Sequence, residues 1–272
     1  MVLENANTTN KQPIIFTDLD GTLLDHKTYS FKSAIKTLNI IKNRKIPIVF
    51  CTSKTRAEIE KYRTILDIKD PFISENGGAI YIPKDYFDFD YSFDKKLKNY
   101  NVVELGTQIK EILKVIILLK EKGYDIKTFS EMTEKEVSKD CGLNILDARL
   151  AKLREYDEVF TIVKKEQEKN IIKTIKNNGY NVTSGGRYHH VMGNNDKGKA
   201  VKILTGLFKI KYKKIKTIGL GDGNNDLPML KTVNCAVIVK NSAHNTLKVS
   251  FDVLRTKKEG SAGWSDAINK II

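Results

Sequence analysis

Short, almost continuous apolar runs alternate with amphipathic segments along this chain. Residues 13–16 and 47–50 are two such runs, and the segment between them places Ala34, Leu38 and Ile41 at helical spacing. Strands with little polar interruption that alternate with helices predict a parallel sheet buried on both faces. The sequence therefore predicts a doubly wound α/β fold, in which ligands bind at the carboxyl ends of the strands.

This alternation is interrupted in the middle of the chain. Beyond residue 80 the sequence becomes aromatic, charged and irregular, and helices and strands then follow in a mixed order. The alternation resumes with a predicted helix at 197–208 and predicted strands at 215–220 and 235–239. We therefore expect a doubly wound, mostly parallel core formed by residues 1–83 and 191–272, and an inserted α+β domain at residues 84–190.

The chain is strongly basic. Its 272 residues include 47 Lys and Arg against 33 Asp and Glu, a formal net charge of +14 at pH 7. Such an excess favours an anionic partner: nucleic acid, an anionic membrane surface or a phosphorylated small molecule. The competing interpretation is a lysine-rich surface on an ordinary enzyme. The densest basic stretch, residues 209–216, has no accompanying nucleic-acid-binding motif, so we expect no nucleic-acid partner.

Several other classes are disfavoured by composition. No apolar run reaches the roughly 18 residues that a membrane-spanning helix needs. Residues 1–12 are polar and lack the apolar core of a signal peptide. Cys51, Cys141 and Cys235 lie far apart and form no C-x-x-C, which argues against a disulfide framework and against a zinc site. We expect a cytoplasmic protein without a membrane partner.

Two aspartates follow the first apolar run. Asp18 and Asp20 stand two residues apart, directly before Gly21 and Thr22. Neighbouring carboxylates repel each other, so that one of them keeps a proton or both bind a cation. Gly21 permits a sharp turn that brings the backbone close to a ligand. The alternative interpretation is an ordinary turn closed by an aspartate side chain.

A second acidic turn, residues 219–226, follows a later apolar run. It contains Asp222 and Asp226, which offer the hard oxygen ligands that suit Mg²⁺. The alternative interpretation is a glycine-rich turn that caps a helix. Taken alone, the second turn is better explained by this alternative, and the pairing of the two acidic turns is what carries further information.

The ordered motifs resemble those of the haloacid dehalogenase-like (HAD) phosphatase superfamily. Residues 18–22 and 221–226 match its first and last motifs, Thr52 closes the second strand, and Lys197 opens the helix before the last acidic strand. The insert is similar to the larger cap of the Cof-type branch. The resemblance covers nearly the whole chain and implies a HAD-like core with an inserted α+β cap that selects the substrate.

Within that branch, residues 51–58, 74–79 and 185–191 resemble the mannosyl-3-phosphoglycerate phosphatases. Residues 154–158 resemble a further stretch of that family, although Val159 stands where the family usually has proline. The resemblance implies a phosphoric monoester hydrolase that converts mannosyl-3-phosphoglycerate, a small anionic substrate, to mannosylglycerate and phosphate. Glucosyl-3-phosphoglycerate, another sugar phosphate and a phosphomutase reaction stay open as alternatives.

The resemblance also implies roles for individual residues. Asp18 is the nucleophile that forms an aspartyl-phosphate, and Asp20 is the general acid and base. Thr52 and Lys197 complete the catalytic set by binding the phosphoryl group. The implied cofactor is Mg²⁺, held by Asp18, by the backbone carbonyl of Asp20 and by Asp222. Asp226 is implied to act through a water molecule or by supporting the direct ligands.

The substrate-binding residues implied by the resemblance come from turns of the core and from the cap. They are Ser53, Lys54, Asn76, Gly77, Gly78, Arg154, Gly186, Arg187, His189 and His190. Arg187 can bind a carboxylate through two parallel hydrogen bonds, and Gly186 would let the backbone approach it. The alternative interpretation of residues 185–191 is an exposed strand with alternating aromatic side chains.

Residues 193–199 also match G-x-x-x-x-G-K, the phosphate-binding loop of nucleotide triphosphatases. Ala200 stands where that loop needs Ser or Thr for Mg²⁺, and Asp196 would face the phosphates. We therefore expect this match to be fortuitous. The sequence makes no prediction of the oligomeric state.

Overall fold

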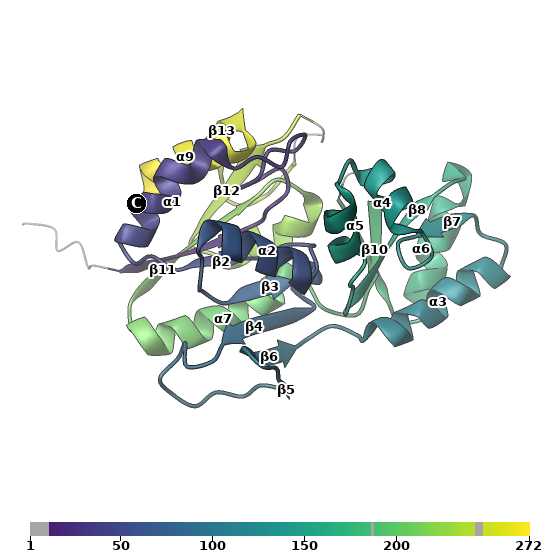
Figure 1. Cartoon of the computed structure of the whole chain (residues 1–272), viewed down its shortest axis with the longest axis horizontal. Coiled ribbons are helices and arrows are strands. Elements are labelled where there is room, and N and C mark those ends of the chain that lie inside the picture. The colour runs from purple at the N-terminus through teal and green to yellow at the C-terminus, as the bar shows by residue number, and fades with distance from the viewer. Residues whose placement is uncertain (1–10, 186–187, 243–246) are drawn as a thin grey trace, which may run out of the picture.

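A parallel sheet runs through the larger lobe of the computed structural model, which is described here over residues 11–185, 188–242 and 247–272 (Figure 1). Its strands are β1 (Gln12–Thr17), β2 (Ile48–Phe50), β11 (Ile215–Gly221), β12 (Cys235–Lys240) and β13 (Leu254–Glu259). Their spatial order is β13-β12-β11-β1-β2, and each neighbouring pair is parallel. The predicted doubly wound, mostly parallel α/β fold is therefore confirmed.

Helices cover both faces of this sheet: α1 (Ile35–Asn43), α2 (Arg56–Leu66), α7 (Lys197–Tyr212), α8 (Leu227–Thr232) and α9 (Gly260–Ile271). Ile15 of β1 packs in one hydrophobic cluster with side chains of α1, α2 and α9. Its neighbours Ile14 and Phe16 pack in another with side chains of α7 and α8. Because successive residues of a strand point to opposite faces, a sheet covered on both faces needs apolar residues throughout.

An antiparallel sheet continues from β2. In spatial order its strands are β3 (Phe72–Ser74), β4 (Ala79–Pro83), β6 (Tyr100–Glu104) and β5 (Lys95–Lys96). A parallel bridge between Cys51 and Ile73 joins β3 to the end of β2. The predicted domain boundary at residue 84 falls between β4 and β6, which pair along residues 79–83. Because the residues between these strands are charged and aromatic, the apolar pattern of the sequence does not predict that the strands pair.

The smaller lobe, residues 109–192, has the mixed α+β character that the sequence predicts for the insert, and it is called the insert below. Its antiparallel sheet has the order β7 (Ile126–Thr128), β8 (Asp157–Ile162), β10 (Tyr188–Met192) and β9 (Asn181–Gly185). Its helices are α3 (Ile109–Glu121), α4 (Glu134–Cys141), α5 (Ile145–Ala151) and α6 (Glu168–Asn177). Side chains of α3 and α6 pack on one face of the sheet, and those of α4 and α5 on the other. Figure 1 shows this lobe beside the end of the parallel sheet.

None of the helices in the described part of the chain is long and apolar enough to cross a membrane.

Thr133 caps α4 in the reciprocal arrangement that its spacing to Glu136 predicts, since each side chain binds the backbone N–H of the other residue.

The start of β8 is tied to the larger lobe through Glu75. Its carboxylate accepts hydrogen bonds from the backbone N–H groups of Glu155, Tyr156 and Asp157, at 2.7–3.0 Å. Gly78 lies so close to the same segment that a Cβ there would stand 2.5 Å from the Tyr156 Cβ. The insert therefore touches the core at a third place besides its two connecting segments.

Glu158 provides a test of charge burial in the insert. Its side chain is buried, and its Oε1 accepts the N–H of Ser130 at 2.9 Å. Burial raises the pKa of Glu158 to about 7, from its ordinary value of 4.5. Between these two values the folded state binds a proton that the unfolded state has released. The free energy of unfolding therefore falls as the pH rises through this window.

We expect Glu158→Gln to raise the free energy of unfolding at pH 8 by about 1–3 kcal/mol and to change it much less at pH 5, because Gln keeps the acceptor and removes the charge. Urea unfolding at both pH values measures the effect, with the exposed Glu166→Gln as control. A loss of stability at pH 8 would contradict this account.

Candidate active site

A cavity of about 650 Å³ lies between the end of the parallel sheet and the insert. Its lining from the larger lobe includes Asp18, Asp20, Ser53, Lys54 and Asp222. Its lining from the insert includes Phe129, Cys141, Leu143, Arg154, Tyr188 and His190. The cavity therefore has an acidic floor in the core and a mixed apolar and cationic wall in the insert.

Asp18 stands directly after β1 and is buried. Its backbone N–H donates to the Leu220 carbonyl of β11 at 2.9 Å, which fixes the direction in which the strand ends. The Lys197 ammonium, which is fully buried at the start of α7, donates to Asp18 Oδ1 at 2.7 Å. Asp196 caps α7 by accepting the N–H of Lys199 at 2.8 Å. The helix start therefore aims a positive charge at the Asp18 carboxylate.

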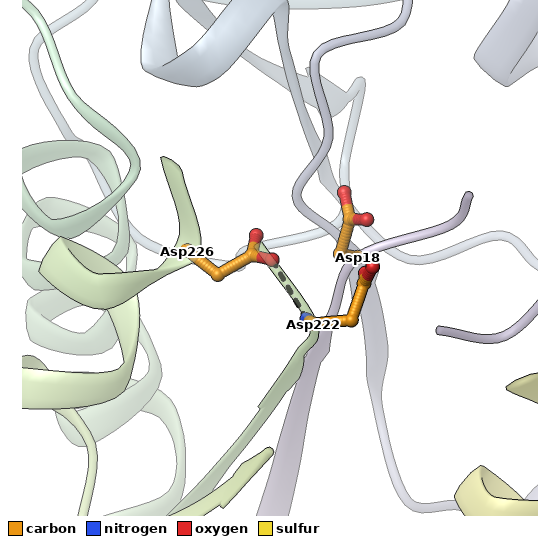
Figure 2. A group of neighbouring side chains, drawn as sticks. All are labelled: Asp18, Asp222 and Asp226. Carbon is orange, nitrogen blue, oxygen red and sulfur yellow. Dashed lines mark hydrogen bonds between the residues drawn. The ribbon is translucent and has the colours of Figure 1, made fainter. Parts of the chain in front are cut away.

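Three aspartates gather beside this charge. Asp18, Asp222 and Asp226 each offer a carboxylate oxygen, and these oxygens lie within 4.8 Å of one another (Figure 2). Asp226 Oδ2 accepts the backbone N–H groups of Asp222 and Gly223, each at 2.9 Å, and its Oδ1 accepts from Lys197 at 2.5 Å. Both oxygens of Asp226 are thus already engaged by protein donors.

Asp222 is oriented by two neutral donors. Thr22 donates its hydroxyl to Asp222 Oδ1 at 2.7 Å, and Asn241 donates its amide to Oδ2 at 2.7 Å. Gly21 has a φ of +75°, and a Cβ at this position would lie 2.6 Å from Asp222 Oδ2. The turn after Asp20 therefore requires glycine for its conformation and for its close approach to the acidic group.

Crowding and burial make this acidic group costly to ionise. Burial, together with the nearby Asp226 carboxylate, raises the pKa of Asp18 to about 7, although Lys197 opposes the shift. Burial and the same neighbour raise the pKa of Asp222 to about 8. A divalent cation would remove this cost, and the group supplies only oxygen ligands. The residues present therefore fit a hard divalent metal ion.

The other two predicted catalytic residues lie close by. Asp20 is partly exposed, with 37% of its side chain accessible, and its Oδ2 lies 2.9 Å from the Lys54 ammonium. Thr52 is fully buried at the end of β2, where its hydroxyl accepts the N–H of Lys54 at 3.4 Å. The ends of β1, β2 and β11 and the start of α7 thus bring the four predicted motifs together.

The predicted substrate-binding residues divide into two groups. Ser53, Lys54, Arg154 and His190 line the cavity. The lining of that cavity does not include Asn76, Gly77, Gly78 or His189. Gly186 and Arg187 lie outside the described residues.

Arg154 and His190 are joined by Asp157. Arg154 donates to Asp157 Oδ1 at 2.7 Å and to the Ser53 carbonyl at 2.8 Å. His190 Nδ1 lies 2.8 Å from Asp157 Oδ2. His189, the preceding residue, stacks obliquely on Phe160 at 5.2 Å between ring centroids, away from this cluster. The two histidines point to different sides of β10, as successive residues of a strand do.

Three site residues were not singled out from the sequence. Asn241 comes just after β12, so the rule that parallel strands bring ligands to their carboxyl ends would have found it. Asp157 and Tyr188 lie within the stretches 154–158 and 185–191, but the sequence gives neither a role of its own. Asp157 acts from behind the cavity by binding Arg154 and His190, and Tyr188 lines the cavity through the packing of the insert.

The chain is similar to known proteins along nearly its whole length. A model of the haloacid dehalogenase-like hydrolase family matches residues 15–265. A protein of Methanococcoides burtonii named glucosyl-3-phosphoglycerate/mannosyl-3-phosphoglycerate phosphatase is 45% identical, over 95% of this chain and 97% of that protein. A mannosyl-3-phosphoglycerate phosphatase of Pyrococcus furiosus is 41% identical, over 85% and 92%.

Solved structures show the same fold. A sugar phosphatase of HAD subclass IIB has a TM-score of 0.67 at 20% identity, with 95% of this chain and 98% of that chain covered. A protein of Thermoplasma acidophilum has a TM-score of 0.68 at 19% identity, over 96% and 98%. The family model spans all four motifs, and the chain belongs to the haloacid dehalogenase-like hydrolases, as those motifs predict.

Proposed function

We propose that this chain is a magnesium-dependent phosphatase that hydrolyses mannosyl-3-phosphoglycerate to mannosylglycerate and phosphate. The observation that carries the proposal is the single cavity that joins the Asp18 carboxylate to Arg154 and His190. A substrate with a phosphate at one end and a carboxylate nearby would meet the acidic floor with its phosphate and the insert with its carboxylate. The names of the relatives in Methanococcoides and Pyrococcus support this substrate class.

Asp18, Asp222 and the backbone carbonyl of Asp20 would hold the metal ion. Asp226 supports them, because its oxygens hold the Asp222 backbone and Lys197. When bound, Mg²⁺ supplies positive charge that offsets the charge of the phosphate.

The reaction proceeds in two steps. First, an oxygen of Asp18 forms a bond to phosphorus while the ester bond breaks, and Asp20 gives its proton to the leaving oxygen. Second, Asp20 takes a proton from water, whose oxygen attacks phosphorus and frees Asp18 and inorganic phosphate. Lys197 keeps the Asp18 carboxylate oriented, and Thr52 binds a phosphoryl oxygen.

The insert from Ile109 to Met192 acts as a cap that selects the substrate. Ser53 and Arg154 meet at the border of core and cap, and His190 contributes from β10. Gly186 and Arg187, assigned by resemblance alone, belong to the same proposed subsite. Asn76, Gly77 and Gly78 act indirectly. Asn76 contacts Asn225 at 3.0 Å, Gly77 allows close packing against the start of α7, and Gly78 allows close packing against Tyr156 of the insert.

The nucleophile and the metal can be tested together. We expect Asp18→Asn, or removal of divalent ions with a chelator, to lower kcat for mannosyl-3-phosphoglycerate by at least about 10³-fold. The substitution removes the nucleophile, and the chelator removes the cation that offsets the charge of the phosphate. Phosphate release measures the effect, and the exposed Asp90→Asn serves as control. Undiminished turnover by folded Asp18→Asn would contradict the mechanism.

His190 provides a test of the cap. Asparagine at this position keeps a donor for Asp157 and removes the second ring nitrogen. We expect His190→Asn to raise KM for mannosyl-3-phosphoglycerate about 10-fold, the cost of one charged hydrogen bond, and to leave KM for p-nitrophenyl phosphate within about 2-fold. His189→Asn, on the other side of the strand, should change neither. Equal effects on both substrates would show that His190 does not bind the carboxylate of the substrate.

The relatives' names also favour glucosyl-3-phosphoglycerate as a second candidate substrate. A phosphate-release screen of the two glycosides and other sugar phosphates distinguishes the candidate substrates. A phosphomutase assay tests the remaining alternative.

A further inference from the structure

Lys54 lines the cavity, yet its ammonium already forms ion pairs with two carboxylates. Its ammonium lies 2.9 Å from Asp20 Oδ2 and 3.2 Å from Glu58 Oε1. The Lys54 and Glu58 side chains are 7% and 8% exposed. The rings of Tyr29 and Tyr62 enclose the ammonium further, with centroids at 5.4 and 5.9 Å. A substrate phosphate would have to compete with all four groups for this cation.

Glu58 is itself fixed by the start of α2. Its Oε2 accepts the backbone N–H of Thr55 at 2.9 Å, and its own N–H donates to the Thr55 hydroxyl at 3.2 Å. This reciprocal capping box holds the Glu58 side chain in one orientation. Glu58 forms an ion pair with Lys54, and Lys54 forms another with Asp20. The capping box of α2 is therefore linked through Lys54 to the Asp20 carboxylate at the cavity.

Asp20 is held through one oxygen only. Oδ2 accepts from Lys54, whereas Oδ1 is buried and has no hydrogen-bond partner among the described residues. In a side chain that is otherwise partly exposed, the contact with Lys54 is what selects the orientation. Loss of this contact would leave the Asp20 carboxyl without the one side-chain partner that fixes its orientation.

We propose that Lys54 is a positioning residue for Asp20, rather than a direct ligand of the substrate as the sequence resemblance implies. Held by the Thr55–Glu58 cap, Lys54 orients the Asp20 carboxyl so that it can transfer a proton to the leaving oxygen as the phosphorus–oxygen bond breaks. This inference rests on the proposed role of Asp20 as acid and base.

The insert contacts the same loop on both sides of Lys54. The Thr55 hydroxyl lies 2.9 Å from the Leu150 carbonyl, and Arg154 donates to the Ser53 carbonyl at 2.8 Å. These contacts from the insert therefore help to hold the loop that orients Asp20.

A leaving-group comparison tests the inference. Glycerol phosphate has a poor leaving group that needs a proton, and p-nitrophenyl phosphate has a good one that does not. We expect Lys54→Met to lower kcat/KM for glycerol phosphate about 10²-fold, the lower end for general acid catalysis, and for p-nitrophenyl phosphate less than about 3-fold. An equal fall for both substrates would overturn the proposal, since a substrate ligand or a structural residue would affect both.

The double variant sharpens the test. If Lys54 acts through Asp20, adding Lys54→Met to Asp20→Asn should cause no further loss with glycerol phosphate. A further loss of about 10-fold or more would overturn the proposal. Glu58→Gln keeps an acceptor for the cap and removes one charge from Lys54. It should show the same leaving-group dependence in weaker form, and it serves as the test if Lys54→Met does not fold. Glu60→Gln, on the same helix and outside the site, is the matched control.

Asp20→Asn alone separates this inference from the proposed mechanism. If Asp20→Asn shows the leaving-group dependence and Lys54→Met does not, the positioning role fails and the mechanism stands. If Asp20→Asn shows no such dependence, both fail.

Discussion

The buried Lys197 ammonium holds the acidic motifs of the site in one arrangement. It donates to Asp18 at 2.7 Å and to Asp226 at 2.5 Å, and no part of its side chain is exposed. Asp226 in turn accepts the N–H of Asp222, so that one cation connects the end of β1, the start of α7 and the turn after β11. Loss of one partner of such a buried pair typically costs about 3–5 kcal/mol, because the other charge is left unpaired. The arrangement of the site is therefore inseparable from the stability of the core.

A second constraint sets the position of the insert. Glu75, Asn76 and Gly77 have successive φ values of +46°, +55° and +88°. For non-glycine residues, this conformation costs on the order of 1 kcal/mol each and persists only where the surroundings enforce it. Two features enforce this conformation. Three backbone N–H groups of the insert bind the Glu75 carboxylate, and Gly77 lies so close to the start of α7 that a Cβ there would stand 2.2 Å from the Asp196 carbonyl oxygen. The strained turn thus connects the insert, the core sheet and the start of α7.

The sequence was informative where a local pattern determines structure. The apolar runs before Asp18 and Asp222 predict strands that are buried on both faces, and parallel strands bring both acidic turns to one edge. The pairing of β4 with β6 and the edge strand β13 could not be predicted in this way. The strand β13 is mostly exposed, with the sequence LRTKKE, and shows no apolar alternation. The Arg154–Asp157–His190 cluster depends on packing between strands far apart in the sequence. The same holds for the ion pair between Lys54 and Asp20, two residues that the sequence assigns to different roles.

The net charge of +14 gives a misleading picture of the site itself. Asp18, Asp20, Glu58 and Asp222 line the cavity, and Asp226 lies beside Asp18 and Asp222. These five acids surround Lys54 and Lys197, and each lysine already contacts two of them. When all seven groups are ionised, the floor is negative, and a phosphate dianion would be repelled from it. Surface lysines can attract an anion over a Debye length of about 10 Å, but they cannot reverse this local sign. Binding of the phosphate therefore requires either protons on the acids or a divalent cation among them. The carboxylates of Asp18, Asp222 and Asp226 would offer oxygen ligands to such a cation, whose positive charge would offset the negative charge of the phosphate.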